Sequence, residues 1–188
     1  MIFYKSKDFQ SGLKVEIDNQ PYSIIENKFV NPGKGQAFNK IKLKNIINEN
    51  VITKTIKIGE KLKAADITNT EAYFLYKTDD IFFFINENDS TSYEVEKDKV
   101  QENELWLKSG VVYLITLWNE KIISIKPPKI LELKVTETDN TEKNSVIAKN
   151  FKYAKLETGA NLKVPIFIKE NDIIKIDTEK KIYISRIS

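Results

Sequence analysis

The chain has 188 residues, with 30 basic and 27 acidic side chains for a formal net charge of +3, and it contains neither cysteine nor histidine. The absence of cysteine excludes disulfides, zinc–thiolate sites and a cysteine nucleophile, and the absence of histidine excludes a Ser-His-Asp triad, a histidine general base and imidazole metal ligands. These absences argue against most classes of enzyme, so we expect a protein without catalytic residues or a metal site of its own.

Alternation of apolar and polar side chains predicts β-strands along nearly the whole chain, with turn-forming residues between the runs. The predicted strands cover residues 13–17, 22–25, 40–44, 51–56, 72–76, 81–85, 111–118, 121–125, 130–135, 161–168, 172–176 and 182–187. A short helical pattern spans residues 97–107. The three consecutive phenylalanines at 82–84 must point to both faces of a strand, so we expect core packing from them rather than a base-stacking platform.

Short strands with frequent turns are typical of small barrels or sandwiches. A barrel of about 60 residues is near the lower size limit of a domain, and three such units fit this chain length. Pro127-Pro128 is the best candidate linker, and a change in charge near residue 64 marks the other boundary. We therefore predict an all-β protein of three consecutive small β-barrel domains, at residues 1–64, 65–127 and 128–188.

Charge is distributed unevenly along the chain. Residues 1–64 carry 12 lysines against 6 acids, residues 65–126 carry 6 lysines against 12 acids, and residues 127–188 carry 12 basic residues against 9 acids. Two basic ends around an acidic middle favour an elongated molecule that contacts a polyanion at its extremities. Ordinary variation of charge between domains explains the same counts equally well.

Neither an export signal nor a membrane span is predicted. Residues 1–8 become charged too early for a signal peptide, and no apolar segment follows them. The longest apolar run, residues 111–118, is about half of the roughly 18 residues that a membrane helix needs. We therefore expect a soluble, cytoplasmic protein.

A glycine-rich loop, Asn-Pro-Gly-Lys-Gly-Gln-Ala-Phe at residues 31–38, lies between two predicted strands. We predict that Pro32 presets φ at the second position of a tight turn and that Gly33 supplies the positive φ that a type II turn needs next. Gly35 leaves the other side of the tip free of a side chain, so Lys34 projects where it can reach a crowded polyanionic site. A phosphate-binding P-loop needs a different order of residues. The alternative is an ordinary hairpin turn with a solvated lysine.

The loop resembles the modification loop of bacterial elongation factor P, whose motif is Pro-Gly-Lys-Gly-[Gln/Gly]-Ala-Phe. Further similarity to this family runs in matching order along the chain. It comprises Asp8-Phe9, Gly12-Leu13, Pro21-Tyr22, Phe29-Val30, Thr116 to Asn119, Pro127-Pro128, Thr158 to Ala160, Lys163 to Phe167, Asp177-Thr178, Tyr183 and Arg186.

The resemblance implies an SH3-like (KOW-like) first domain and two OB-type barrels in an L-shaped, tRNA-sized arrangement. It also implies a monomeric elongation factor, not an enzyme, that binds the ribosome between the P and E sites and stimulates peptide-bond formation at consecutive prolines. The lysine that matches Lys34 is extended in many bacteria with β-lysine by a lysyl-tRNA-synthetase-like ligase, and in some it is then hydroxylated. No other cofactor is implied.

Two groups of residues are the predicted sites. Peptidyl-tRNA and rRNA are expected at the loop and at three lysines that alternate with apolar residues on one solvent face, namely Pro32, Gly33, Lys34, Gly35, Lys40, Lys42 and Lys44. The small subunit, on the anticodon side, is expected at Tyr183 and Arg186, the latter being the single arginine of the chain. The alternatives are a solvated strand face for the lysines, and a barrel-edge aromatic and a surface cation for the second pair.

The chain departs from the family pattern at two places. Asn144-Ser145-Val146 stands where many members have Gly-Asp-Thr, which puts an E-site contact through that loop in doubt. Glu179 and Lys181 replace the arginine and glycine that usually follow Asp-Thr near the C-terminus. Three rival identities are a paralogous factor that lacks the Pro-Gly-Lys-Gly tip, the two-domain hypusine-carrying factor whose loop contains histidine, and a general single-stranded RNA-binding OB protein that does not depend on Lys34.

Overall fold

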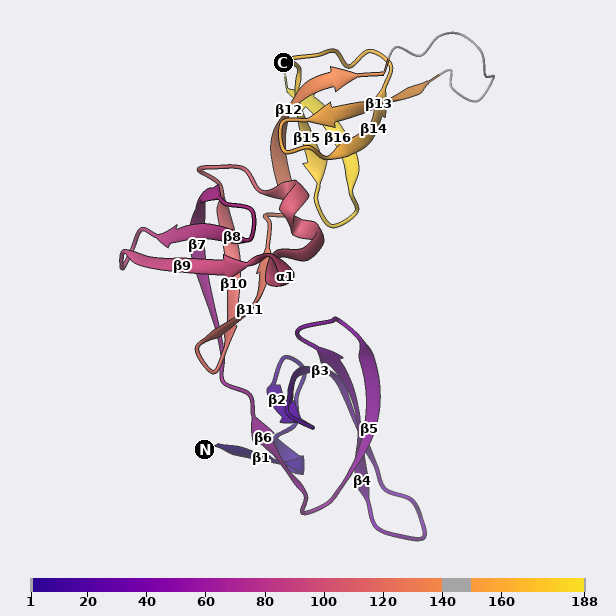
Figure 1. Ribbon diagram of the computed structural model, residues 1–188. Coiled ribbons are helices and arrows are strands. Elements are labelled where there is room, and N and C mark those ends of the chain that lie inside the picture. The colour runs from indigo at the N-terminus through magenta and orange to yellow at the C-terminus, as the bar shows by residue number, and fades with distance from the viewer. Residues whose placement is uncertain (1, 140–149, 188) are drawn as a thin grey trace. The chain divides into compact units, whose positions relative to one another are not determined.

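The computed structural model describes residues 2–139 and 150–187, which form three β-sheets of six, five and five strands (Figure 1). Helical structure within this part of the chain consists of the 3₁₀ turn η1 (Ser6–Asp8), the short helix α1 (Lys97–Val100) and the 3₁₀ helix η2 (Gln101–Trp106). The predicted all-β class is confirmed.

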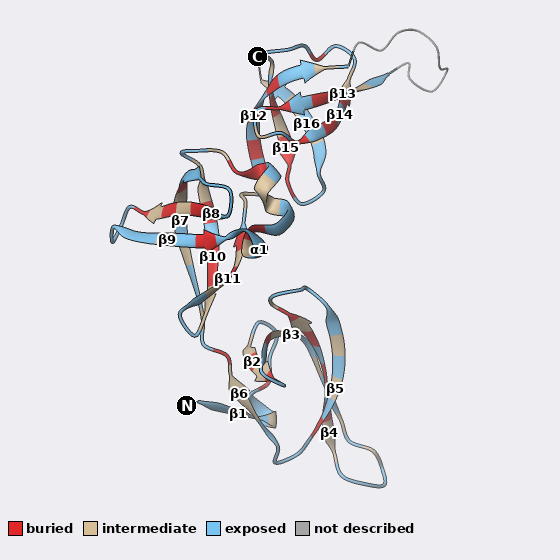
Figure 2. Ribbon diagram, viewed as in Figure 1, coloured by how far each residue is buried: buried red, intermediate tan, exposed pale blue. Residues whose placement is uncertain are grey.

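The first sheet has the strand order β1-β6-β2-β3-β4-β5. Its strands are β1 (Phe3–Lys5), β2 (Lys14–Ile17), β3 (Gln20–Val30), β4 (Phe38–Asn45), β5 (Val51–Lys57) and β6 (Lys61–Ala64). Apolar residues from alternate positions, including Val15, Ile24 and Leu43, form its core. The alternation is visible as bands of buried residues along the strands (Figure 2).

The second sheet has the order β11-β10-β7-β8-β9. Its strands are β7 (Ile67–Lys77), β8 (Ile81–Asn86), β9 (Thr91–Glu96), β10 (Val112–Trp118) and β11 (Lys121–Lys126). Phe82 and Phe84 are almost fully buried, whereas Phe83 lies on the other face of β8 and stacks on Tyr76 at 4.6 Å between ring centroids. The expected core packing of the phenylalanine run is therefore confirmed.

The third sheet has the order β14-β13-β12-β15-β16. Its strands are β12 (Ile130–Thr138), β13 (Phe151–Leu156), β14 (Asn161–Pro165), β15 (Ile173–Asp177) and β16 (Ile182–Ile187). Leu133, Val135, Val164 and Ile174 are fully buried in its core.

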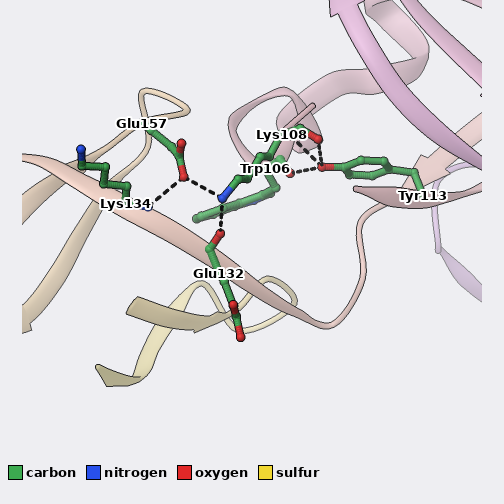
Figure 3. Close-up of polar contacts among 6 residues, drawn as sticks. All are labelled: Trp106, Lys108, Tyr113, Glu132, Lys134 and Glu157. Atoms are coloured by element: carbon green, nitrogen blue, oxygen red, sulfur yellow. Dashed lines mark hydrogen bonds and ion pairs between the residues drawn. The ribbon is translucent and has the colours of Figure 1, made fainter. Parts of the chain in front are cut away.

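By its internal contacts the chain forms two compact units, residues 1–69 with 116–124 and residues 70–115 with 125–188. Within the second unit, Trp106 at the end of η2 is buried in the core of the third sheet. The neighbouring Lys108 Nζ lies 3.0 Å from both the Glu132 carbonyl oxygen and the Glu157 carboxylate (Figure 3). An indole in the apolar core and an ammonium at its edge therefore join the segment after α1 to the third sheet.

Four strands were not predicted from the sequence, namely β1, β6, β9 and β13. The predicted strand at 161–168 ends at Pro165, because residues 166–168 form a turn that closes with a hydrogen bond from the Ile168 amide to the Pro165 carbonyl. The predicted strand at 22–25 is much longer, since β3 continues to Val30.

Candidate functional site

The Lys34 loop is carried by a long two-stranded hairpin. β3 and β4 pair from Tyr22 opposite Asn45 to Val30 opposite Phe38, and the loop consists of the residues between the last pair. All of β5 pairs with β4, from Val51 opposite Lys44 to Lys57 opposite Phe38. Because the strand next to the loop is hydrogen-bonded on both sides, the base of the loop is fixed by a regular sheet.

The turn chemistry of the loop differs from the prediction. Gly33 does not adopt the left-handed φ that a type II turn requires at this position; Gly35 does, with φ 105°. The prediction for Gly33 is therefore wrong, and the glycine that the backbone conformation requires is the one after Lys34. A Cβ on Gly35 would meet the Pro32 ring no closer than 3.9 Å, so the requirement comes from the backbone and not from crowding.

Lys34 is exposed, as is most of the loop between β3 and β4 (Figure 2). Within the described residues its ammonium has neither an ion-pair nor a hydrogen-bond partner. Both neighbouring glycines are exposed, and a Cβ built on Gly33 would meet no described atom within 4 Å beyond its two chain neighbours. The loop therefore presents the Lys34 ammonium at a narrow tip. The two residues that flank Lys34 have no side chains that would block its approach to a partner.

Three of the predicted lysines alternate with buried residues on β4. Ile41 and Leu43 are fully buried, whereas Lys40 and Lys42 are exposed on the opposite face. Lys44 lies on the same face but is half-buried, and its Nζ pairs with the Glu49 carboxylate at 3.1 Å. The structure thus leaves two of the three lysines exposed, and Lys42 has the exposed Glu26 opposite it in the β3–β4 register.

Lys28 joins this face and was missed by the sequence reasoning. It lies directly opposite Lys40 in the β3–β4 register, and both side chains are exposed. Like charges in such cross-strand positions destabilise a sheet, so the pair favours a role with an anion. The position of Lys28 could have been predicted from the sequence, because a hairpin whose last pair is Val30 and Phe38 places Lys28 opposite Lys40.

Tyr183 and Arg186 lie on β16, and a bulge brings them to one face. Tyr183 pairs with Ile176 and Arg186 with Ile174, so β16 has one extra residue, Ile184, between these positions. Tyr183 packs against the third core. The Arg186 guanidinium lies 5.7 Å from the centroid of the Phe167 ring and 3.7 Å from the Asp172 carboxylate. The arginine therefore has local partners but remains about half exposed.

The substituted loop at Asn144-Ser145-Val146 lies outside the described residues. Among the described residues, histidine, cysteine, aspartate and glutamate side chains do not form groups of three or more that would suit a metal ion. Across residues 2–139 and 150–187, every helix is too short or too polar to span a membrane. The Lys34 loop and the lysine face beside it remain the principal candidate site.

Comparison with protein-family models gives three consecutive matches. Residues 5–62 match the elongation factor P (EF-P) KOW-like domain, residues 67–125 match the elongation factor P OB domain, and residues 131–186 match the elongation factor P C-terminal domain. Together these matches cover nearly the whole chain, and each corresponds to one of the three sheets.

Two solved structures share part of the fold. A translation initiation factor eIF-5A family protein from Naegleria fowleri aligns with a TM-score of 0.53 at 15% identity, over 66% of this chain and 97% of that one. Eukaryotic translation initiation factor 5A from Methanococcus jannaschii aligns with a TM-score of 0.54 at 16% identity, over 67% and 92% of the two chains. At this level of identity the likeness shows a common fold over about two thirds of the chain.

Proposed function

Because the chain belongs to the elongation factor P family and is thus a translation factor, we propose that it binds the ribosome between the P and E sites and stimulates peptide-bond formation at consecutive prolines. The observation that carries this proposal is the presentation of Lys34. Lys34 is exposed between two glycines, and β4, the strand that follows the loop, is paired with β3 on one side and with β5 on the other. In this proposal the domains are residues 1–64, 65–127 and 128–188.

The proposed action of Lys34 is to fix the geometry of peptidyl-tRNA. A cation delivered on a narrow loop contacts the phosphates and carbonyls of the acceptor end, and it holds the reacting ester near the incoming amine. Correct positioning of two reactants removes much of the entropic barrier to their reaction. The reacting groups belong to the ribosome and its substrates, so the factor itself supplies position and charge and is not an enzyme.

The lysine face of the first sheet supports the loop by contacting phosphates. Lys28, Lys40 and Lys42 project from neighbouring positions of β3 and β4. Each contact of this kind releases a counterion and adds affinity independently of sequence. Lys44 contributes less, because its charge is already paired with Glu49.

A second contact with the small subunit, on the anticodon side, is proposed for Tyr183 and Arg186. The bulge at Ile184 sets both residues on one face of β16, and the guanidinium remains about half exposed beside Phe167. A planar guanidinium bonds a phosphate in a bidentate manner, which lysine does not.

The proposal includes covalent extension of Lys34 with β-lysine by a lysyl-tRNA-synthetase-like ligase, with optional hydroxylation. A longer cationic side chain extends the reach of the loop without widening it. The protein acts in the cytoplasm as a monomer. Intact mass measurement of the native protein tests the modification, and an unmodified mass excludes it.

Translation of a reporter with three consecutive prolines tests the proposed function. Without the factor the reporter stalls, and the wild-type protein restores synthesis. The Lys34→Ala variant should reduce the rescue by about tenfold or more, which corresponds to about 1.4 kcal/mol of lost transition-state stabilisation. The matched control is Lys61→Ala, which removes an exposed lysine from β6 of the same sheet.

The two outcomes separate this function from general RNA binding. Rescue by Lys34→Ala equal to that of the wild type would show that the lysine is not the acting group. If Lys34→Ala and Lys61→Ala reduced the rescue equally, rescue would depend only on the total positive charge of the protein.

A further inference from the structure

A cavity of about 380 Å³ lies at the base of the hairpin that carries the Lys34 loop. It is lined by Ser6, Lys7, Asn27, Phe29, Asn39 and Ile58. Its volume is within the range of pockets that bind small organic molecules. Every lining residue belongs to the first compact unit, so the cavity does not depend on the rest of the chain.

The cavity forms where the apolar core face of the first sheet becomes polar. On β4 the buried face reads Leu43, Ile41, Asn39 toward the loop, and Asn39 is only 4% exposed although it is an amide. Phe29 lies opposite Asn39 in the register and shares its face. A further apolar residue at position 39 would simply extend the core, so the amide is an unusual choice at this depth.

The orientation of Asn39 follows from a chain of hydrogen bonds. The Phe9 carbonyl can only accept, and the Asn27 Nδ2 donates to it at 2.8 Å. The Asn27 Oδ1 therefore faces Asn39 and accepts from its Nδ2 at 2.8 Å. This leaves the Asn39 Oδ1, which accepts no hydrogen bond from any residue that the structure describes. Asn39 as a whole is only 4% exposed, and its Oδ1 is an acceptor at the wall of an open cavity that a donor on a bound ligand can reach.

The walls of the cavity combine apolar surface with a positive charge. Phe29 is 59% exposed and Ile58 is 56% exposed, which is high for residues of this kind beside a core. Ser6 contributes a hydroxyl, and Lys7 contributes an exposed ammonium without an ion-pair partner in the described parts of the chain. A ligand that fits must therefore have a flat apolar face, a hydrogen-bond donor on its edge and an attached anion.

We propose that this cavity binds one adenine nucleotide of a single-stranded RNA segment. The base stacks on Phe29 against Ile58, its exocyclic amino group donates to the Asn39 Oδ1, and its phosphate pairs with Lys7. Asparagine pairs with adenine through this amino group and an adjacent ring nitrogen, and base–aromatic stacking is the usual means of holding unpaired bases. An apolar peptide side chain would leave the Asn39 Oδ1 without a donor, and a carboxylate would place a negative charge against it.

This binding goes beyond the proposed function and does not need Lys34. The cavity lies at the base of the hairpin, whereas Lys34 lies in the loop beyond the last strand pair. The cavity is therefore tested by variants of its own lining, and the loop by Lys34→Ala. Loss of reporter rescue in this variant and loss of nucleotide binding in cavity variants are separate results, so either proposal can fail alone.

NMR of the full chain with labelled asparagine side chains measures the binding directly. Titration with the tetranucleotide of adenosine should shift the Asn39 and Asn27 amide resonances, and the tetranucleotide of uridine should bind about tenfold more weakly. Titration with AMP should shift the same resonances at higher concentration. The Phe29→Ala variant should lose about tenfold in affinity, because one stacking contact is worth that much. Phe3→Ala, which removes an exposed phenylalanine from β1, is the matched control and should bind normally.

Several outcomes would overturn the proposal. Equal affinity for the adenosine and uridine tetranucleotides would remove the role of the Asn39 Oδ1. Binding of AMP without binding of the tetranucleotide would identify a free nucleotide as the ligand in place of RNA. Shifts of the Asn39 and Asn27 amides that persist unchanged in Phe29→Ala would show that no base stacks in the cavity.

Discussion

Gly35 is the residue whose backbone conformation shapes the Lys34 loop. Its φ of 105° lies in the region that L-residues rarely adopt, whereas Gly33 lies outside that region. The substitution Gly35→Ala should therefore lower the free energy of unfolding by about 1–2 kcal/mol, or force the loop into a different conformation. The matched substitution Gly33→Ala should be neutral, or stabilising by up to about 1 kcal/mol through the unfolded chain.

Chemical denaturation of both variants, with loop amide shifts as a second readout, checks this prediction. An alanine at 35 that leaves both stability and loop resonances unchanged would contradict it. So would a larger effect at position 33 than at position 35.

The sequence predicted the exposure of single residues where motif and local pattern agreed. Lys34 was expected to project from the loop because proline and glycine precede it and glycine follows it, and Lys40 and Lys42 were expected on a solvent face because they alternate with apolar residues. Lys28 and Asn39 were missed, because their significance depends on which residue lies across the hairpin. Gly33 was given the wrong conformation, since two glycines on either side of one lysine do not reveal which of them is left-handed.

Among contacts between secondary-structure elements, the Tyr113 side chain on β10 forms hydrogen bonds with the backbone at the end of η2. Its Oη donates to the Trp106 carbonyl at 2.9 Å and accepts from the Lys108 amide at 2.7 Å (Figure 3). The side chain is fully buried, and burial raises the pKa of its phenol from 10.0 to about 12. The neutral phenol is thus favoured in the folded protein, because an ionised Oη could not donate to Trp106 and would be poorly solvated.

This pKa predicts a loss of stability in alkali. Between pH 10 and about 12 the unfolded chain releases the phenolic proton and the folded protein retains it, so the unfolded state is favoured. The contribution is present below pH 10 and falls by about 2–3 kcal/mol as the pH rises through the folded pKa. Tyr113→Phe should cost about 1–3 kcal/mol at neutral pH, since it leaves the Trp106 carbonyl and the Lys108 amide without a partner.

Denaturation of the wild type and of Tyr113→Phe across this pH range isolates the effect from lysine titration, which both proteins share. The difference in stability between them should shrink as the pH rises. A constant difference would show that the phenol does not titrate differently in the folded and unfolded states.

Strands with a long apolar run or a long alternation were predicted. β4 alternates apolar and polar residues, β8 and β10 are nearly continuous apolar runs, and the structure contains each of them. β1 and β6 have only three and four residues and complete the first sheet by pairing with each other, so nothing local in the sequence marks them. The bulge at Ile184, which sets Tyr183 and Arg186 on one face, arises from pairing with β15 and likewise has no local signature.

For the whole molecule, the uneven charge predicts which part of the chain responds to salt. Residues 1–64 carry an excess of six positive charges, and residues 65–126 an equal negative excess. Within the first sheet, Lys28 and Lys40 lie opposite each other without an acidic partner among the described residues. Binding to a polyanion should therefore depend on this sheet, and the acidic segment should contribute little to the electrostatic part of the affinity.

Ribosome binding measured over a range of salt concentrations checks whether a single lysine of the first sheet contributes to the salt dependence. If Lys40 contacts a phosphate, Lys40→Gln should reduce the slope of log affinity against log salt by about 0.7–0.9, the value for one released counterion. Lys121→Gln removes an exposed lysine from β11 in the acidic segment and should leave the slope unchanged. Equal slopes for Lys40→Gln and the wild type would exclude a phosphate contact at Lys40, whatever the effect on rescue. A reduced slope in both variants would mean that the response follows net charge, and that the lysine face of β3 and β4 has no special part in binding.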